Sequence, residues 1–318
     1  MNRYSEKRET NHPMVKQLME FLRLCDADPQ EFIEECLFIK TKDQQTVLLH
    51  LNTAQSLIYK RIKRLRAQGK PVRIIVLKAR QEGVSTLCEG LIFERTVRFE
   101  NTNSLIVAHE PESTEAIFAM SKLFYDMLPV DVKPMRRYDN KRQMVFENPE
   151  EKSRTADPGL RSRMVIATAD KVKIGRGLTL HNFHGSEVAF WKNAKELMLS
   201  VLQAIPNLPD TSVFLESTAN GFGGDGEYFY KAVQDSLADK NEFELIFLPW
   251  HLMPEYSRPF TSDKEKATFS ETLDEYERNL KRKDKLTLEQ LRWRRWAIQN
   301  KCGGDLEKFK QEYPATIE

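Results

Sequence analysis

The sequence lacks the features that mark a membrane protein, a disulfide-stabilised protein or a strongly basic protein. Its four cysteines, Cys25, Cys36, Cys88 and Cys302, form no C-x-x-C pair, which fits buried or idle thiols in a reducing cytoplasm. No apolar run approaches the ~20 residues of a membrane span, and the polar N-terminus does not resemble a secretory signal. The net charge of +2 does not indicate a nucleic-acid partner, so any basic surface is expected to be local.

What is present is a composition that can form a sizeable core. Of the 318 residues, 40% are hydrophobic and 10% aromatic, and strand-like and helix-like patterns alternate along much of the chain. This alternation predicts an α/β protein with a mostly parallel sheet flanked by helices. We expect a helical or extended arm over residues 1–45, a core over 46–250, and a helical lid or linker over 251–318.

A strand, a polar loop and a helix start follow one another at residues 74–86. Four apolar residues, Ile74 to Leu77, predict a buried strand, and a helical pattern opens at Ser85. The usual phosphate-binding loop is G-x-x-x-x-G-K-[ST]. Here Gly83 matches the second glycine and Ser85 matches the hydroxyl that binds Mg²⁺, but Val84 replaces the lysine.

Lysine stands instead at the first position of this loop. From the end of the strand, the flexible side chain of Lys78 can reach the same phosphates, and Arg80 adds a second cation. The hydroxyl of Thr86 and the loop amides of Gln81, Gly83 and Val84 are candidates to hold phosphate oxygens. The alternative is an ordinary strand-to-helix turn with a solvated Lys and Arg.

A second candidate motif is Ser186-Glu187, which follows an expected strand. An ATPase needs a carboxylate there to orient and deprotonate the attacking water, and a second one to hold Mg²⁺ through its waters. Glu187 fits the first role, whereas Ser186 offers only a hydroxyl to the metal's water shell. The alternative is a helix start, with Ser186 as its cap, and we expect a helix over residues 187–205.

Two further segments carry polar groups of interest. Ser217, Thr218 and Asn220 lie in S-T-A-N-G at the end of a strand, where hydroxyls can sense a γ-phosphate; the alternative is a polar turn. Gln55 has the donors and acceptor that suit the edge of adenine, although a surface helix Gln is the simpler interpretation.

Residues 129–176 are rich in Lys and Arg. We interpret this stretch as a β-rich insertion rising from the sheet, and as a candidate contact with a DNA backbone or a neighbouring subunit. A solvated hairpin region is the alternative.

Four of these segments, in this order, resemble motifs of one family. K-A-R-Q-E-G-V-S-T at 78–86 resembles the displaced-lysine Walker A loop of viral large terminases, the ATPases that package DNA into procapsids. L-N-T-A-Q at 51–55, S-E-V-A at 186–189 and S-T-A-N-G at 217–221 are similar to the adenine-reading, second-motif and coupling segments of that family. The resemblance covers roughly residues 46–318.

The resemblance implies a P-loop (ASCE/RecA-like) fold and an ATP-hydrolysing motor of tailed bacteriophages that uses ATP and Mg²⁺. It implies that Gln55 reads adenine, that Glu187 activates water, that Ser217, Thr218 and Asn220 couple hydrolysis to movement, and that Arg176 acts as an arginine finger. Implied partners are double-stranded DNA, further copies in a ring (expected to be a pentamer) on the portal protein, and the small terminase subunit. The implied location is the host cytoplasm, transiently at the procapsid portal.

Large terminases also carry a C-terminal nuclease domain, and we expect no nuclease activity here because the chain stops before such a domain fits. Two other functions stay open. A two-domain helicase needs a second sheet domain, and little chain follows Leu248 for it. A DNA-assembly module that binds ATP without turnover is favoured slightly by Val84 and by the missing acid at Ser186.

Overall fold

A computed structural model describes residues 13–170, 177 and 179–317. Within these residues the centre is an eight-stranded sheet of order β10–β3–β9–β8–β4–β7–β6–β5. Neighbours from β10 to β7 run parallel, and β6 and β5 are antiparallel additions at one edge. The bounds are β3 Val72–Lys78, β4 Asn103–Ala108, β5 Tyr138–Asp139, β6 Gln143–Glu147, β7 Gly159–Thr168, β8 Asn182–Ser186, β9 Ser212–Ser217 and β10 Glu244–Leu248.

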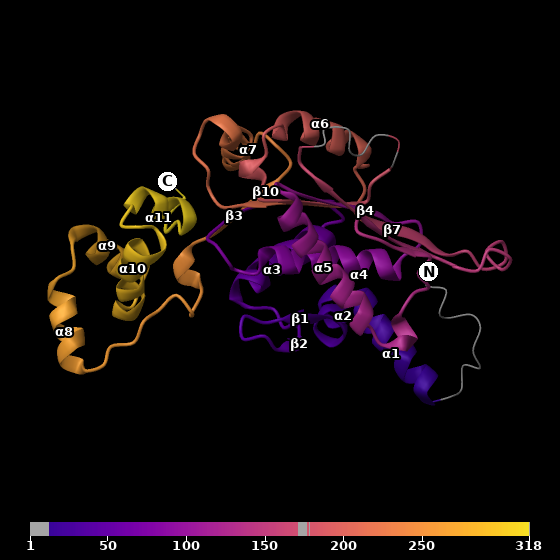
Figure 1. Cartoon of the computed structure of the whole chain (residues 1–318), viewed down its shortest axis with the longest axis horizontal. Helices are drawn as coiled ribbons and strands as arrows, with labels where there is room; N and C mark the ends of the chain where they lie inside the picture. The colour runs from indigo at the N-terminus through magenta and orange to yellow at the C-terminus, as the bar shows by residue number, and fades with distance from the viewer. Residues whose placement is uncertain (1–12, 171–176, 178, 318) are drawn as a thin grey trace.

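Helices cover both faces of this sheet, which gives three layers (Figure 1). One face carries α3 Thr53–Ala67, α4 Val84–Arg98 and α5 Pro111–Met127, with α1 Pro13–Ala27, α2 Pro29–Cys36 and the hairpin β1 Phe38–Lys40 and β2 Thr46–Leu48 beyond them. The other face carries α6 Ala194–Ala204 and α7 Glu227–Leu237. The predicted mostly parallel α/β architecture is therefore confirmed.

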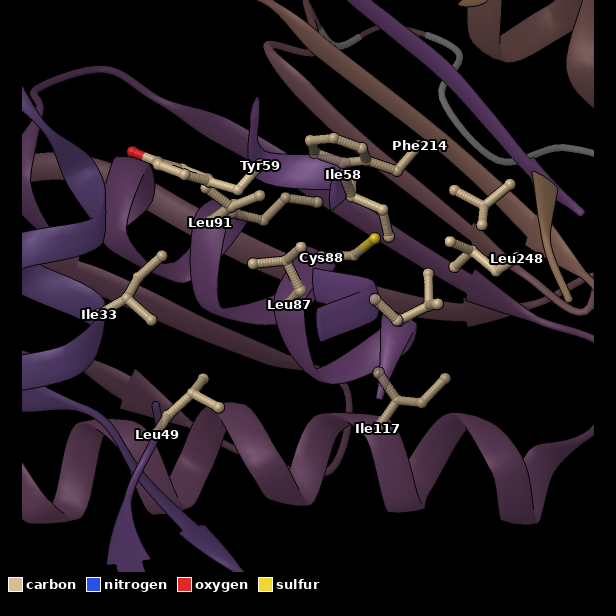
Figure 2. Packing of buried hydrophobic residues seen from close by; sticks show 14 of the residues in the cluster. Ile33, Leu49, Ile58, Tyr59, Leu87, Cys88, Leu91, Ile117, Phe214 and Leu248 are labelled. Carbon is tan, nitrogen blue, oxygen red and sulfur yellow. The ribbon is translucent and has the colours of Figure 1, made fainter. Parts of the chain in front are cut away.

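The central strand β3 shows why the sheet is buried on both faces. Ile74 and Val76 belong to the hydrophobic cluster on the α3–α4–α5 side, and Ile75 and Leu77 to the cluster on the α6–α7 side. Every residue of β3 is buried, as expected of an interior parallel strand whose successive side chains point to opposite faces. Figure 2 shows the first cluster, where Leu87, Cys88 and Leu91 of α4 pack among residues from distant parts of the chain.

The N-terminal segment is part of this core. Cys25, Phe32, Ile33 and Leu37 are fully buried in the same cluster as the residues of β3 and α4, and Figure 2 shows Ile33 beside the α4 side chains. The predicted division at residue 45 does not coincide with any break in packing. The long-range contacts of α2 leave no local sequence signature, so the patterns of residues 1–45 did not reveal that part of this segment packs in the core.

The structure corrects the prediction for residues 129–176. Strand β7 is an integral strand of the main sheet, since its residues 163–168 pair in parallel with β4, and β6 and β5 extend that sheet. Its apolar residues Leu160, Met164 and Ile166 are buried, so β7 belongs to the core and is not an insertion that rises from it.

The helix predicted over residues 187–205 is also corrected. A short 3₁₀ turn, η3 Val188–Phe190, comes first, and α6 begins only at Ala194. Glu187 has a left-handed backbone with φ 55°, which no α-helix continues.

The C-terminal residues form a group of helices to one side of the sheet (Figure 1). They are α8 Asp263–Glu271, α9 Glu275–Lys283, α10 Leu288–Lys301 and α11 Leu306–Glu312. A capping box of Thr287 and Gln290 starts α10. Stacked rings hold the group together: Trp293 lies 5.0 Å from Trp250 and 4.5 Å from Tyr256, centroid to centroid.

Over the residues that the structure describes, none of the helices combines the length and the apolar character needed to cross a bilayer.

Candidate nucleotide site

The loop between β3 and α4 ends in a backbone conformation that requires glycine. Gly83 precedes α4 with φ 77°, and a Cβ placed there would lie 2.9 Å from Nε2 of Gln55. Gln81 is also left-handed, with φ 57°. The turn leads directly into α4, whose first N–H groups have no partner within the helix and carry a partial positive charge. This is the geometry that binds phosphate.

The first turn of α3 holds the loop in place. Gln55 Nε2 donates to the carbonyl of Gly83 at 2.8 Å, and Asn52 Nδ2 donates to the carbonyl of Glu82 at 3.1 Å. The Gln55 Oε1 accepts from the Asn52 N–H as part of a capping box. The structure thus gives Gln55, which is buried, a role in fixing the loop. Its role in reading adenine stays a prediction.

Lys78 ends β3 and lies between two carboxylates. Its Nζ is 2.9 Å from Oε1 of Glu187 and 3.1 Å from Oε2 of Glu216. Burial lowers the pKa of Lys78, but the charges of Glu216 and then Glu187 outweigh it and raise that pKa above its usual range. Lys78 is therefore a fully charged cation at the carboxyl end of β3, in front of the loop.

The position that lysine usually occupies is unsuited to a charge here. Val84 is 1% exposed and belongs to the cluster under the sheet. That Lys78, at the first position of the loop, takes the place of this lysine stays a prediction.

The remaining predicted phosphate ligands differ in their present contacts. Ser85 Oγ donates to Oε1 of Glu216 at 2.7 Å, and Thr86 Oγ1 lies 3.6 Å from the sulfur of Met120. Arg80 forms an ion pair through Nε with Glu312 of α11. Gln81 is exposed. Arg80 thus reaches α11, and its predicted contact with phosphate requires that this ion pair open.

Glu187 links the second motif to S-T-A-N-G. Its Oε2 accepts from Ser217 Oγ and from the N–H of Thr218, both at 3.3 Å. Asn220 Nδ2 donates to the carbonyl of Ala189 at 2.9 Å. Strands β8 and β9 are neighbours, so the ends of three adjacent strands bring Lys78, Glu187 and the S-T-A-N-G segment together.

Glu216 is the site residue that the sequence analysis did not assign. It is fully buried and contacts both Lys78 and Ser85. His184 Nε2 lies 3.4 Å from its Oε1, and His184 Nδ1 lies 2.7 Å from Oε1 of Glu89. Burial raises the pKa of Glu216, but the charge of Lys78 and the neighbouring His184 and Ser186 side chains lower it below its usual range. A usable signal was present: Glu216 is an acid that directly follows the apolar run Val213-Phe214-Leu215.

Glu82, in the loop itself, is a second acid of unusual environment. It is 1% exposed, and among the described residues neither carboxyl oxygen has a hydrogen-bond partner. Burial raises the pKa of Glu82 to about 9, against a smaller lowering effect of Lys78. The side chain is therefore protonated at neutral pH.

The oxygen donors near the loop fit Mg²⁺. Ser85, Glu216 and Ser186 offer hydroxyl and carboxylate oxygens, which are the ligands that this cation prefers. Among the residues described, no three or more His, Cys, Asp or Glu side chains are grouped as metal ligands. A cation held by few protein ligands, by phosphates and by water matches this arrangement.

Arg176, the predicted arginine finger, lies outside the described residues. Several other basic residues of 129–176 already have partners: Arg137 pairs with Glu147, Arg136 with Asp139, and Arg163 donates to Asn103. The contact of this segment with DNA or with a neighbouring subunit stays a prediction.

No family model and no curated protein matches the sequence. Among solved structures, the large terminase of bacteriophage HK97 superposes with a TM-score of 0.57 at 15% identity, over 89% of this chain and 53% of that one. The chain thus spans about half the length of the HK97 protein. A mutant of the large terminase ATPase domain of Thermus phage P74-26 superposes with a TM-score of 0.50 at 15% identity, over 85% of this chain and 95% of that domain.

The chain has the fold of a large terminase ATPase domain. The fold explains why the predicted residues meet: β9 and β8 lie between β3 and β4, so the chain leaves β3 and returns to the sheet three positions away. In parallel α/β sheets, ligands bind at the carboxyl ends of the strands beside such a jump. In this terminase-like fold those ends carry Lys78, Glu187 and Ser217.

Proposed function

We propose that this chain is the ATP-hydrolysing part of a viral DNA-packaging motor. The observation that carries the proposal is the position of Lys78, a buried cation at the front of a phosphate-type loop, 2.9 Å from Glu187. The terminase-like fold supports it, because the sheet order brings Lys78 and Glu187 together at the carboxyl ends of the strands.

In this proposal the phosphates of ATP bind at the start of α4. Lys78 exchanges part of its pairing with Glu187 and Glu216 for the β- and γ-phosphates, and the loop amides from Gln81 to Thr86 hold phosphate oxygens. Arg80 joins them once its ion pair with Glu312 opens. Charge neutralisation and fixed geometry are the main contributions that a protein makes to phosphoryl transfer.

Glu187 is the general base of the proposed reaction. The oxygen of a water attacks the γ-phosphorus, the bond to the β–γ bridging oxygen breaks, and the water proton passes to the Glu187 carboxylate. The side chain of Glu187 is 27% exposed, so water reaches it. Mg²⁺, when bound with ATP, would supply positive charge to the phosphates, and Ser85 and Glu216 are the residues suited to its shell.

Coupling is assigned to the S-T-A-N-G segment. Ser217 and the N–H of Thr218 contact Glu187, and Asn220 Oδ1 accepts from Gln311 of the C-terminal helices at 3.2 Å. A change at Glu187 after hydrolysis therefore has a path of direct contacts to those helices. The same proposal includes three kinds of partner: double-stranded DNA, further copies of the chain in a ring on a portal protein, and the small terminase subunit. In that ring Arg176 acts as the arginine finger, and the location is the host cytoplasm.

The test is phosphate release from ATP, measured with and without duplex DNA, for the wild-type chain and Glu187→Gln. We expect the variant to lose turnover by about 10²-fold or more and to keep its affinity for ATP. Turnover of Glu187→Gln at the wild-type rate would show that Glu187 is not the base. A wild-type chain that binds ATP and releases no phosphate under any condition would favour the assembly module.

A further inference from the structure

The second motif lacks a carboxylate at the position where P-loop ATPases use an acid to hold Mg²⁺. The second motif has Ser186 where an acid is expected to hold the metal's water shell, and Ser186 is the last residue of β8. A hydroxyl carries no charge and is a weaker acceptor for metal-bound water than a carboxylate. The second motif by itself therefore supplies no carboxylate at position 186.

The neighbouring strand supplies a carboxylate at the same level. In the sheet register, the Cα partner of Ser186 is Glu216 on β9, and β9 lies between β8 and the loop strand β3. Residues paired across adjacent strands point to the same face of the sheet. Glu216 thus faces α4, as an acid at position 186 would, and is one strand closer to Lys78.

Glu216 contacts Ser85 in the way that a carboxylate contacts a metal ligand without binding the metal itself. The Ser85 hydroxyl donates a hydrogen bond to Glu216 Oε1 at 2.7 Å. The lone pairs of the serine oxygen therefore stay free for a cation. Carboxylates that accept a proton from a metal ligand fix the ligand's orientation and raise its basicity.

Glu216 is also held rigidly from behind. His184, fully buried, lies 3.4 Å from Oε1 of Glu216 through Nε2 and 2.7 Å from Glu89 through Nδ1. Ser121 of α5 donates to the other oxygen of Glu89 at 2.8 Å. This chain of contacts runs from α5 through α4 and β8 to β9, and it holds His184 beside the Glu216 carboxylate.

We propose that Glu216 on β9 takes the part of the missing acid on β8 and is the carboxylate that orients Ser85 and the water shell of Mg²⁺ in the nucleotide site. This rests on the proposed function, because it assumes that a magnesium nucleotide binds at the loop. In place of an Asp at position 186 on β8, the chain has a Glu, one methylene longer, at the paired position 216 on β9. Glu216 is thus a positioning residue and not the general base.

The experiment measures how the affinity for the fluorescent nucleotide mant-ADP depends on Mg²⁺, using the whole chain. We expect Glu216→Gln to need about 10- to 100-fold more Mg²⁺ than the wild type for half of the metal-dependent gain in affinity. The double variant S186D/E216Q returns the carboxylate to β8 and conserves the charge around Lys78. Its Mg²⁺ requirement should move back towards the wild-type value.

A matched control separates this role from a general loss of a buried ion pair. Glu94 of α4 is buried and paired with Arg98 at 2.6 Å, so Glu94→Gln removes a comparable carboxylate away from the loop. It should lower the unfolding temperature and leave the Mg²⁺ requirement unchanged. If Glu216→Gln does not fold, E216D keeps the charge beside Lys78 with a shorter side chain, and it should likewise need more Mg²⁺.

Two different failures can be told apart. A wild type that binds no mant-ADP at any Mg²⁺ concentration removes the proposed function and this inference together. A wild type that binds it in a Mg²⁺-dependent way, with the same Mg²⁺ requirement in Glu216→Gln or E216D, overturns only the role of Glu216. An S186D/E216Q variant that behaves like Glu216→Gln overturns the relocation to β9.

Discussion

Lys78 has a side chain whose charge is set by its neighbours. It lies within 3.1 Å of two carboxylates, and an isolated ammonium at this depth would lose its proton. The two acids keep it charged and aim it across the front of the loop. A phosphate has to compete with them, so we expect nucleotide binding to change the environment of Glu187 and Glu216 as well as that of Lys78.

The buried acid Glu82 leads to a prediction about pH. Because the pKa of Glu82 is raised to about 9 in the fold, the folded state favours the protonated side chain. Its favourable contribution is present below the unfolded pKa near 4.5 and is lost as the pH rises towards 9. Replacement by Gln, which does not titrate, should therefore stabilise the protein increasingly across this range, by at most about 3 kcal/mol near pH 7.

Urea unfolding of wild type and Glu82→Gln between pH 5 and pH 9 measures this difference. Glu271, exposed at the end of α8, provides the control, since Glu271→Gln should show no such growing gain. A difference for Glu82→Gln that stays constant over the whole range would mean that the carboxyl group is ionised in the folded protein.

At the scale of elements, the phosphate loop is stabilised by helix α3. Asn52 and Gln55, in the first turn of α3, hold the carbonyls of Glu82 and Gly83. The loop conformation thus depends on a helix that ends before β3 begins. We expect substitutions at Gln55 to weaken phosphate binding whether or not this side chain also meets the base.

Two glycines of similar backbone geometry make this testable. Gly83 has φ 77° and Gly69 has φ 65°, but a Cβ at Gly83 meets Gln55 at 2.9 Å whereas one at Gly69 meets nothing within 4 Å. Gly69→Ala should cost about 1–2 kcal/mol from the left-handed backbone alone. Gly83→Ala should cost more and should also lower the affinity for ADP, because Gln55 has to give way.

Chemical denaturation gives the two stabilities, and a fluorescence titration with mant-ADP gives the affinity. Equal stability losses for both variants, with unchanged affinity, would contradict the idea that Gln55 shapes the loop.

At the scale of the whole molecule, the C-terminal helices contact the loop and the coupling segment. Glu312 of α11 pairs with Arg80 and accepts the Arg80 N–H through its backbone carbonyl at 3.1 Å. Tyr256 donates to the carbonyl of Arg80, and Gln311 contacts Asn220. Because of these contacts, we expect a change at the nucleotide site to alter the docking of the C-terminal helices.

Glu312→Gln should loosen this docking and release Arg80. We expect faster hydrogen exchange over α11 and an affinity for ADP that rises by up to about fivefold, the size of a partly exposed ion pair. Glu307→Gln is the matched control: Glu307 is also in α11 but pairs with Lys310 at the surface, so it should change neither quantity. Faster exchange with unchanged affinity would remove Arg80 from the phosphate ligands.

The sequence by itself determined the local features of this protein. The apolar runs of β3 and β4, the glycine before α4, the capping boxes of α3 and α10, and the order of the motifs all follow from short-range preferences. They were sufficient to predict the α/β class, and they are the basis on which Lys78 and Glu187 are proposed as site residues, because each depends on a few neighbouring residues.

The tertiary structure alone decided which strands are neighbours. Pairing of β9 with β3 and β8 brings Glu216 to Ser85 and Lys78, and parallel pairing of β7 with β4 turns a supposed insertion into part of the sheet. Such contacts join residues from 30 to 140 positions apart in the sequence, through backbone hydrogen bonds that any sequence can form. The physical reason is that the choice of neighbour is set by burial of whole sheet faces and not by any local pattern.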